Sequence, residues 1–136
     1  MKIYLKEKDA NCFVCGDENL LGLKIKFFPN GTNGSIANYT VRQEHIGWPG
    51  ILHGGVLFTL MDEAVGWCLY FNNLRGVTAK AETRFRLPAF VGDELIVTGL
   101  IIERTRKLAR MRAEVRKANN TTNKIAELEA TMYLDY

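Results

Sequence analysis

The chain has 136 residues, 47% of them hydrophobic and 24% charged, and a formal net charge of +3 at pH 7. This length suits one domain with its own core, and the composition excludes disordered and fibrous proteins. The chain does not begin with a signal-peptide pattern, and no apolar run is long enough for a membrane span. We therefore expect a single cytoplasmic domain over residues 1–136 with no membrane partner.

The first predicted elements are two strands joined by a turn. Leu21–Phe28 and Ser35–Arg42 alternate apolar and polar residues, which is typical of strands with one buried face. Between them, Pro29–Gly34 is rich in residues that tolerate positive φ and predicts a turn. The side chains predicted to be buried are Leu21, Leu23, Ile25, Phe27, Ala37, Tyr39 and Val41.

A long helix is predicted from about Gly54 to Phe71, after a loop over His45–Leu52. Apolar residues surround almost the whole helix, so it should be buried on most sides. The exceptions are Thr59, Asp62 and Gly66, which fall at i, i+3 and i+7 on one stripe. A ligand or a second subunit could approach the helix along this stripe.

Four more strands are predicted after the helix, the first of them with strict alternation. Their ranges are Thr78–Leu87, Glu94–Glu103, Ala109–Lys117 and Lys124–Leu134. The order β-β-α-β-β-β-β predicts an α+β fold, a mostly antiparallel sheet of about six strands around one helix. One helix leaves edges and a face of such a sheet uncovered, so we expect at least a dimer.

Two features point to acyl-transfer chemistry. Gly54 lies at the predicted helix start, where free backbone N–H groups can stabilise an oxyanion. Asp62 is an acid in an apolar segment, which is costly unless the acid is paired or functional. His53 is the third candidate catalytic residue; it has no neighbouring nucleophile with which to build a triad, so we expect it to fix the loop so that the Gly54 N–H points at the substrate. Glu63 lies about 100° around the helix from Asp62, and we expect it to pair with an arginine of the sheet.

The charge of the chain is uneven. Lys80 to Lys117 carries ten bases and five acids, whereas the preceding residues are neutral overall. A locally basic segment suits a phosphate-bearing ligand or nucleic acid, and a solvated sheet face explains it equally well.

The three cysteines are Cys12, Cys15 and Cys68. Their odd number argues against a disulfide framework. Cys12 and Cys15 have the spacing of a zinc knuckle, but no second CxxC or HxxxH offers the remaining ligands, and His45 or His53 could do so only by coincidence. We expect a loop closed by packed thiols, no metal, and Cys68 in the core.

The segments that carry a family resemblance are Cys12–Gly16, Asn19–Leu23, Gly47–Gly55, Leu60–Ala64, Phe85–Pro88 and Gly92–Leu95. In these the chain resembles the hotdog-fold acyl-CoA thioesterases, in particular the branch similar to the phenylacetate-pathway (PaaI-like) thioesterases. The resemblance implies a curved sheet wrapped around one helix, and a homodimer or a homotetramer of two dimers. It also implies an acyl-CoA substrate and no further cofactor.

The resemblance also assigns roles to residues. It implies that the Gly54 N–H forms an oxyanion hole and that Asp62, contributed by the partner subunit, is the general base or the nucleophile. The loop before the helix lacks the Asn or Gln of many relatives, which makes His45 a candidate for orienting water. The candidate substrate contacts are Gly55, Thr59, His45 and, for the coenzyme A phosphates, Arg84, Arg106 and Lys107.

Two alternatives remain open. The first is a hotdog-fold hydratase or dehydratase, which His45 and Pro49–Leu52 superficially echo, although no Phe-Pro follows the histidine. The second is a non-catalytic acyl-CoA sensor. An acid at Asp62 favours the thioesterase over both, and we expect no nucleic-acid partner.

Overall fold

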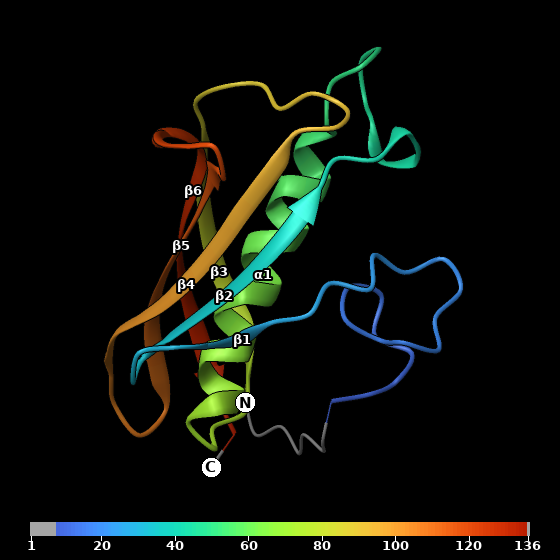
Figure 1. Cartoon of the computed structure of the whole chain (residues 1–136). Helices are drawn as coiled ribbons and strands as arrows, with labels where there is room; N and C mark the ends of the chain where they lie inside the picture. Colours follow the sequence, from blue (N-terminus) through green and yellow to red (C-terminus); the bar gives the residue numbers. More distant parts are fainter. Residues whose placement is uncertain (1–7, 136) are drawn as a thin grey trace.

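One long helix lies against the concave face of a curved, six-stranded antiparallel sheet (Figure 1). The computed structural model describes residues 8–135, so the first seven residues and the last one of the expected domain lie outside the described residues. Across the sheet the strands run in the order β1-β2-β4-β5-β6-β3. The predicted element order and fold class are confirmed.

The helix α1 (Gly54–Phe71) has the bounds that its pattern predicted. A 3-10 helix (Gln43–His45) precedes it. The strands are β1 (Phe28–Asn30), β2 (Gly34–Thr40), β3 (Gly76–Phe85), β4 (Glu94–Arg104), β5 (Leu108–Lys117) and β6 (Asn120–Leu134). Within residues 8–135, no helix combines the length and the apolar character that crossing a membrane requires.

The first predicted strand is wrong in its extent. Leu23, Ile25 and Phe27 are buried as predicted, but Leu21 is 85% exposed. Strand pairing begins only at Phe28, because the backbone before it hydrogen-bonds to a loop near the start of the chain. The Ile25 N–H, for example, donates to the Val14 carbonyl at 2.8 Å. The predicted turn is also shorter, since its outer residues are paired in β1 and β2.

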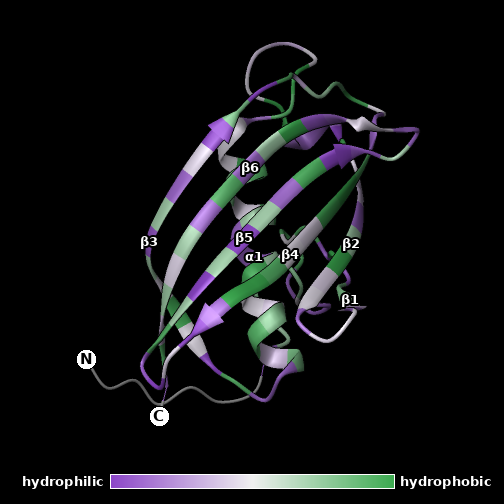
Figure 2. Cartoon of the chain, turned by 90° about the vertical axis from the view of Figure 1, so that its left-hand side faces the viewer, coloured by the Kyte–Doolittle hydropathy of each residue, from purple (hydrophilic) through white to green (hydrophobic). Residues whose placement is uncertain are grey.

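Alternating side chains of the strands form the core with α1. Figure 2 shows hydrophobic and hydrophilic residues alternating along β4, β5 and β6, with α1 behind the sheet. The inward residues meet the apolar sides of the helix, as period-two burial requires. Side chains that are at most 2% exposed include Leu60, Met61, Leu95, Val97, Met111, Val115 and Leu128.

The helix comes closest to the sheet at Ala64. A Cβ atom on Gly99 of β4 would lie 2.8 Å from the Ala64 carbonyl oxygen, closer than real Cβ contacts. Ser35, opposite Gly99 in the β2–β4 register, donates from its hydroxyl to the same oxygen at 2.7 Å. The buried Cys68 thiol donates to the Ser35 hydroxyl at 3.4 Å, and burial raises its pKa to about 11. Small residues on the sheet therefore set how deeply α1 lies.

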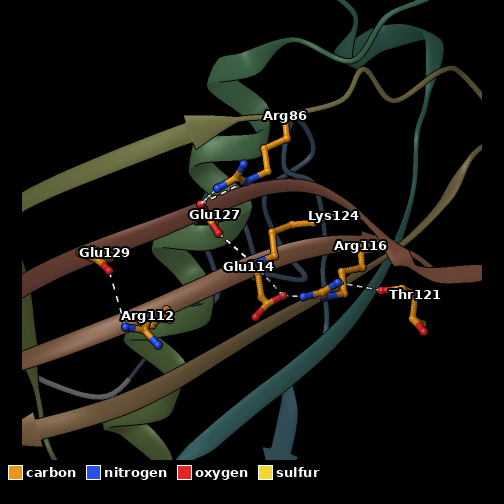
Figure 3. A network of polar contacts seen from close by, with 8 residues as sticks. All are labelled: Arg86, Arg112, Glu114, Arg116, Thr121, Lys124, Glu127 and Glu129. Atoms are coloured by element: carbon orange, nitrogen blue, oxygen red, sulfur yellow. Dashed lines mark hydrogen bonds and ion pairs between the residues drawn. The ribbon is translucent and has the colours of Figure 1, made fainter.

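The outer face of the sheet carries a network of ion pairs (Figure 3). Arg86 Nε donates to Glu127 Oε1 at 3.2 Å, and Lys124 Nζ donates to Glu127 Oε2 at 2.8 Å. Hydrogen bonds from Lys124 and Arg86 lower the pKa of Glu127 to about 2. Arg112 pairs with Glu129 at 3.6 Å. The positive charges of Arg86 and Arg112 in the basic segment are thus compensated by acids of β6. This is the arrangement expected of a solvent-facing sheet surface.

We expect Gly99→Ala to lower the free energy of unfolding by about 1–3 kcal/mol, because the new methyl group meets a backbone oxygen that cannot rotate away. Chemical denaturation with an unchanged m-value measures this loss. Thr98→Ala, at the neighbouring position of β4, is the control and should cost less than about 1 kcal/mol. Equal losses in the two variants would contradict the close contact at Ala64.

Candidate active site

The loop before α1 is shaped by its own backbone hydrogen bonds. The Gly47 N–H donates to the Ile51 carbonyl at 2.9 Å, and the Leu52 N–H donates to the Ala89 carbonyl at 2.9 Å. Gly50 has a φ of +75°, a conformation that favours glycine in such a tight turn. These hydrogen bonds fix the position of the backbone just before the first residue of the helix.

His53 caps the N-terminus of α1. Its Nδ1 atom accepts a hydrogen bond from the Gly55 N–H at 2.8 Å, and its carbonyl accepts from the Val56 and Leu57 N–H groups. The capping bond involves the Gly55 N–H and not the Gly54 N–H. Within residues 8–135, no group accepts a hydrogen bond from the Gly54 N–H. The helix dipole adds partial positive charge at this position. The Gly54 N–H is therefore ready to bind an anionic oxygen.

A hollow of about 640 Å³ opens beside this N–H group. Its lining consists of Ile46, Gly47, Trp48, Ile51, Leu52, His53 and Gly54. Most of these residues are apolar, with few polar groups at the helix start, which is the usual composition of a small-molecule site. The hollow has the chemistry to hold an apolar group attached to a carbonyl.

Asp62 lies two turns further along α1 and contacts β3. Its Oδ1 atom accepts a hydrogen bond from the Thr78 hydroxyl at 2.6 Å. The alternation predicted over residues 78–87 would put Thr78 on the same face as Lys80, away from the helix. A register shift between Thr78 and Lys80 breaks that alternation and lets the hydroxyl reach Asp62. The sequence does not reveal Thr78 as a site residue, because no glycine or proline marks the irregularity.

Glu63 contacts the first part of the chain rather than the sheet. Its Oε1 atom is 3.0 Å from Lys8 Nζ and accepts a hydrogen bond from Trp67 Nε1 at 3.1 Å. The expected ion pair exists, but the predicted sheet arginine is wrong. Glu63 points toward the N-terminal segment because it lies a third of a turn from Asp62, which faces β3.

His45 and Thr59 both make internal hydrogen bonds. His45 Nδ1 lies 2.7 Å from the Tyr39 hydroxyl, and its carbonyl accepts from the His53 N–H at 3.0 Å. Burial, helped by the positive charge of Arg42, lowers the pKa of His45 and favours its neutral form. Thr59 donates to the Gly55 carbonyl at 2.8 Å, within the helix. His45 thus supports the loop that leads to His53.

The three basic residues predicted to contact phosphates are not brought together in one chain. Arg84 is opposite Glu127 of β6, whereas Leu108, next to Lys107 and Arg106, is opposite Tyr133 of the same strand. These two positions on β6 are six residues apart, about 20 Å along a strand. One chain therefore offers two separate basic positions.

Gly54 and Asp62 are also separated within one chain. They are eight residues apart on one helix, about 12 Å along its axis. A reacting atom needs both an oxyanion donor and a base or nucleophile within about 3 Å. Strand β3 lies next to both groups. Near one end of β3, the Phe85 ring lies 3.5 Å from where a Cβ on Gly54 would be, and near the other end Thr78 contacts Asp62.

Comparison with known proteins identifies similar sequences. The family model described as Thioesterase superfamily matches residues 49–124, a segment that includes Gly54, Asp62 and Thr78. The mouse protein acyl-coenzyme A thioesterase 13 is 30% identical over 92 residues, which are 66% of this chain and 64% of that relative. The chain thus spans less than two thirds of the length of this curated relative.

Solved structures share the fold. A hypothetical thioesterase protein from Streptococcus pneumoniae TIGR4, solved with coenzyme A, has a TM-score of 0.75 and 20% identity, covering 81% of this chain and 84% of that chain. The E. coli PaaI protein from the phenylacetic acid degradation operon also has a TM-score of 0.75, with 21% identity over 82% of this chain and 79% of that chain. Together with the family model, these matches confirm the resemblance to hotdog-fold thioesterases.

We expect His53→Ala to lower the free energy of unfolding by about 0.5–2 kcal/mol, because the Gly55 N–H loses its capping acceptor. His53→Asn should retain most of the stability, since asparagine is a good N-cap residue. Thermal and chemical denaturation of the two variants measure the difference. Equal losses in both variants would show that the cap is not what the imidazole provides.

Proposed function

The chain belongs to the thioesterase superfamily, and on that premise we propose that it is an acyl-CoA thioesterase. It would hydrolyse the thioester to a free acid and coenzyme A. The name of the mouse relative and the coenzyme A in the S. pneumoniae structure support this class of substrate. The observation that carries the proposal is the position of β3, which contacts one candidate group near each of its ends.

Among the strands of residues 8–135, β3 is an edge strand with β6 as its one neighbour in the sheet. Its outer edge can pair with the β3 of a second copy, and antiparallel pairing about a two-fold axis makes both contacts equivalent. Such pairing inverts one strand relative to the other, so the Phe85 end of one β3 meets the Thr78 end of its partner. The Gly54 N–H of one subunit is thereby brought toward Asp62 of the other.

Exposed apolar side chains at the Gly54 end support this arrangement. Trp48 is 80% exposed, Phe85 55% and Phe90 47%. Large apolar side chains that gather at one end of a molecule mark a binding or association surface. A second subunit and the acyl group would cover them in the complex that we propose.

The proposed reaction uses the two groups on opposite sides of the thioester. The Gly54 N–H binds the carbonyl oxygen and stabilises the negative charge that develops on it. Asp62 of the partner subunit either accepts a proton from the attacking water or attacks the carbonyl carbon itself. The Thr78 hydroxyl holds Asp62 Oδ1 and leaves the second carboxylate oxygen for this step. The C–S bond then breaks, and on the general-base route the sulfur of coenzyme A leaves with the proton that Asp62 took from water. On the nucleophilic route the acyl group first stays on Asp62 as an anhydride, and a water molecule then hydrolyses it to the free acid, supplies the proton for the sulfur and restores the carboxylate.

The same pairing would bring the basic residues that are separated in one chain to the same end of the dimer, once at each end. Arg84 lies near the Phe85 end of β3, and Leu108, next to Lys107, is level with Val77 near the other end. Inversion of the partner places its Arg106 and Lys107 at the end where Arg84 lies. These side chains could bind the phosphates of coenzyme A.

We expect Asp62→Asn and Gly54→Pro each to reduce thiol release from acyl-CoA by roughly 100-fold or more. Proline replaces the N–H hydrogen with a ring carbon, which removes the donor and occupies the position of the bound oxygen. The helix start tolerates it, because proline is favoured at the first helical position and His53 has the extended ψ of 132° that a following proline requires. A panel of short, medium, long and aromatic acyl-CoAs is the substrate, and the protein's own thiols are subtracted as a blank. Gly54→Ala keeps the N–H and is the matched control.

Unfolding and refolding the two inactive variants together tests whether the site is shared. If Gly54 and Asp62 act across the interface, each mixed dimer contains one intact site, and random mixing restores roughly a quarter of the wild-type activity. If both act within one chain, mixing restores none. Acyl-CoA binding without turnover on any substrate would instead indicate a sensor.

We expect Thr78→Val to lower kcat roughly tenfold with little change in KM, because losing one hydrogen bond of about 1–2 kcal/mol leaves Asp62 less well oriented. Thr78→Ser keeps the hydroxyl and should restore most of the rate. Steady-state kinetics on the best substrate measure both variants, and denaturation curves show whether they are folded. A similar rate loss in the serine variant would mean that the threonine methyl group matters rather than the hydrogen bond.

A further inference from the structure

Two thiols and a carboxylate converge where the N-terminal segment lies beside α1 (Figure 1). One ligand atom each from Cys12, Cys15 and Glu63 lies within 4.8 Å of the others. Cys12 Sγ is 3.6 Å from Glu63 Oε1, and the Glu63 side chain is only 12% exposed. The proposed reaction uses none of the three.

The loop that carries the cysteines is tightly folded. The Gly16 N–H donates to the Cys12 carbonyl at 2.9 Å, and a Cβ on Gly16 would lie 2.3 Å from the Ala10 carbonyl oxygen. Only glycine fits at this position, so the CxxC sequence is followed by the residue that lets the chain fold back. The two thiols are thereby held together on one side of the loop.

We propose that Cys12, Cys15 and Glu63 bind a thiophilic divalent cation, for which zinc is the best fit. Tetrahedral zinc, with Zn–S of about 2.3 Å and Zn–O of about 2.1 Å, places a sulfur and an oxygen ligand about 3.6 Å apart and two sulfurs about 3.8 Å apart. The first distance matches the separation of Cys12 Sγ and Glu63 Oε1. Water would complete the coordination.

The charges of the cluster balance both without and with such an ion. Lys8 Nζ lies 3.0 Å from Glu63 Oε1, so with both thiols protonated the cluster is neutral. A divalent cation displaces the two thiol protons. Two thiolates, one carboxylate, one lysine and the cation again sum to zero, so binding leaves no net charge in this half-buried place.

The site would connect two distant parts of the chain. Two ligands come from the N-terminal loop and the third from the middle of α1, next to Asp62. Because a metal that binds only the folded arrangement stabilises it, the cation would fix the loop against the helix. This inference rests on the cluster geometry and does not depend on thioesterase activity.

Cobalt(II) titration of the tag-free, reduced and chelator-treated protein tests the proposal. We expect one equivalent to bind with a sulfur-to-cobalt charge-transfer band and the intense visible bands of tetrahedral cobalt, all of which zinc abolishes. Cys12→Ser and Cys15→Ser should lose the charge-transfer intensity, and Glu63→Gln should weaken binding at least tenfold. Cys68→Ala, which removes the cysteine outside the cluster, should bind cobalt like the wild type.

Three results would overturn the proposal. The first is the absence of cobalt bands in the folded, reduced wild-type protein, and the second is bands that persist in both serine variants. The third is a mass lower by two hydrogens in protein purified with zinc, which would show that Cys12 and Cys15 form a disulfide instead. If the serine variants do not fold, alkylation of the wild-type thiols with and without zinc tests the proposal. Zinc must protect Cys12 and Cys15 from alkylation and leave the reactivity of Cys68 unchanged.

Discussion

The contact between the Ala64 carbonyl and the small residues of β2 and β4 sets the depth and rotation of α1. Because successive helical residues point about 100° apart, three neighbours then face three different partners. Ala64 faces the middle of the sheet, Asp62 faces β3, and Glu63 faces the N-terminal segment. A larger residue at Gly99 would displace all three at once. The close packing of α1 on the sheet therefore also fixes the positions of the site residues.

Much of the fold could be predicted from periodicity. The helix has the predicted bounds because an almost fully apolar run begins at a capping residue, and the last three strands differ from their predictions by at most four residues. The first strand could not be predicted correctly, because alternation reports which side chains are buried and not which backbone they pair with. Ile25 is buried like a strand residue, although its N–H bonds to a loop.

The site could be predicted only where its groups are encoded locally. His53 and Gly54 follow from a helix start, and Asp62 from an acid within an apolar helix. The contact of Thr78 with Asp62 depends on the register shift in β3, and no residue type in the sequence indicates that shift. The third member of the thiol cluster was missed for a different reason. Glu63 lies far from the cysteines in sequence, and only the folded N-terminal segment brings them together.

The separation of Gly54 and Asp62 along one rigid helix has a consequence for assembly. No side-chain motion closes about 12 Å along a helix axis, so the reaction that we propose needs a second copy, and the edge of β3 is the feature that can align it. In such an enzyme the surface that associates and the surface that reacts are the same. Changes at the β3 edge would then alter stability and activity together, whereas changes in the thiol cluster would reach the site only through the helix.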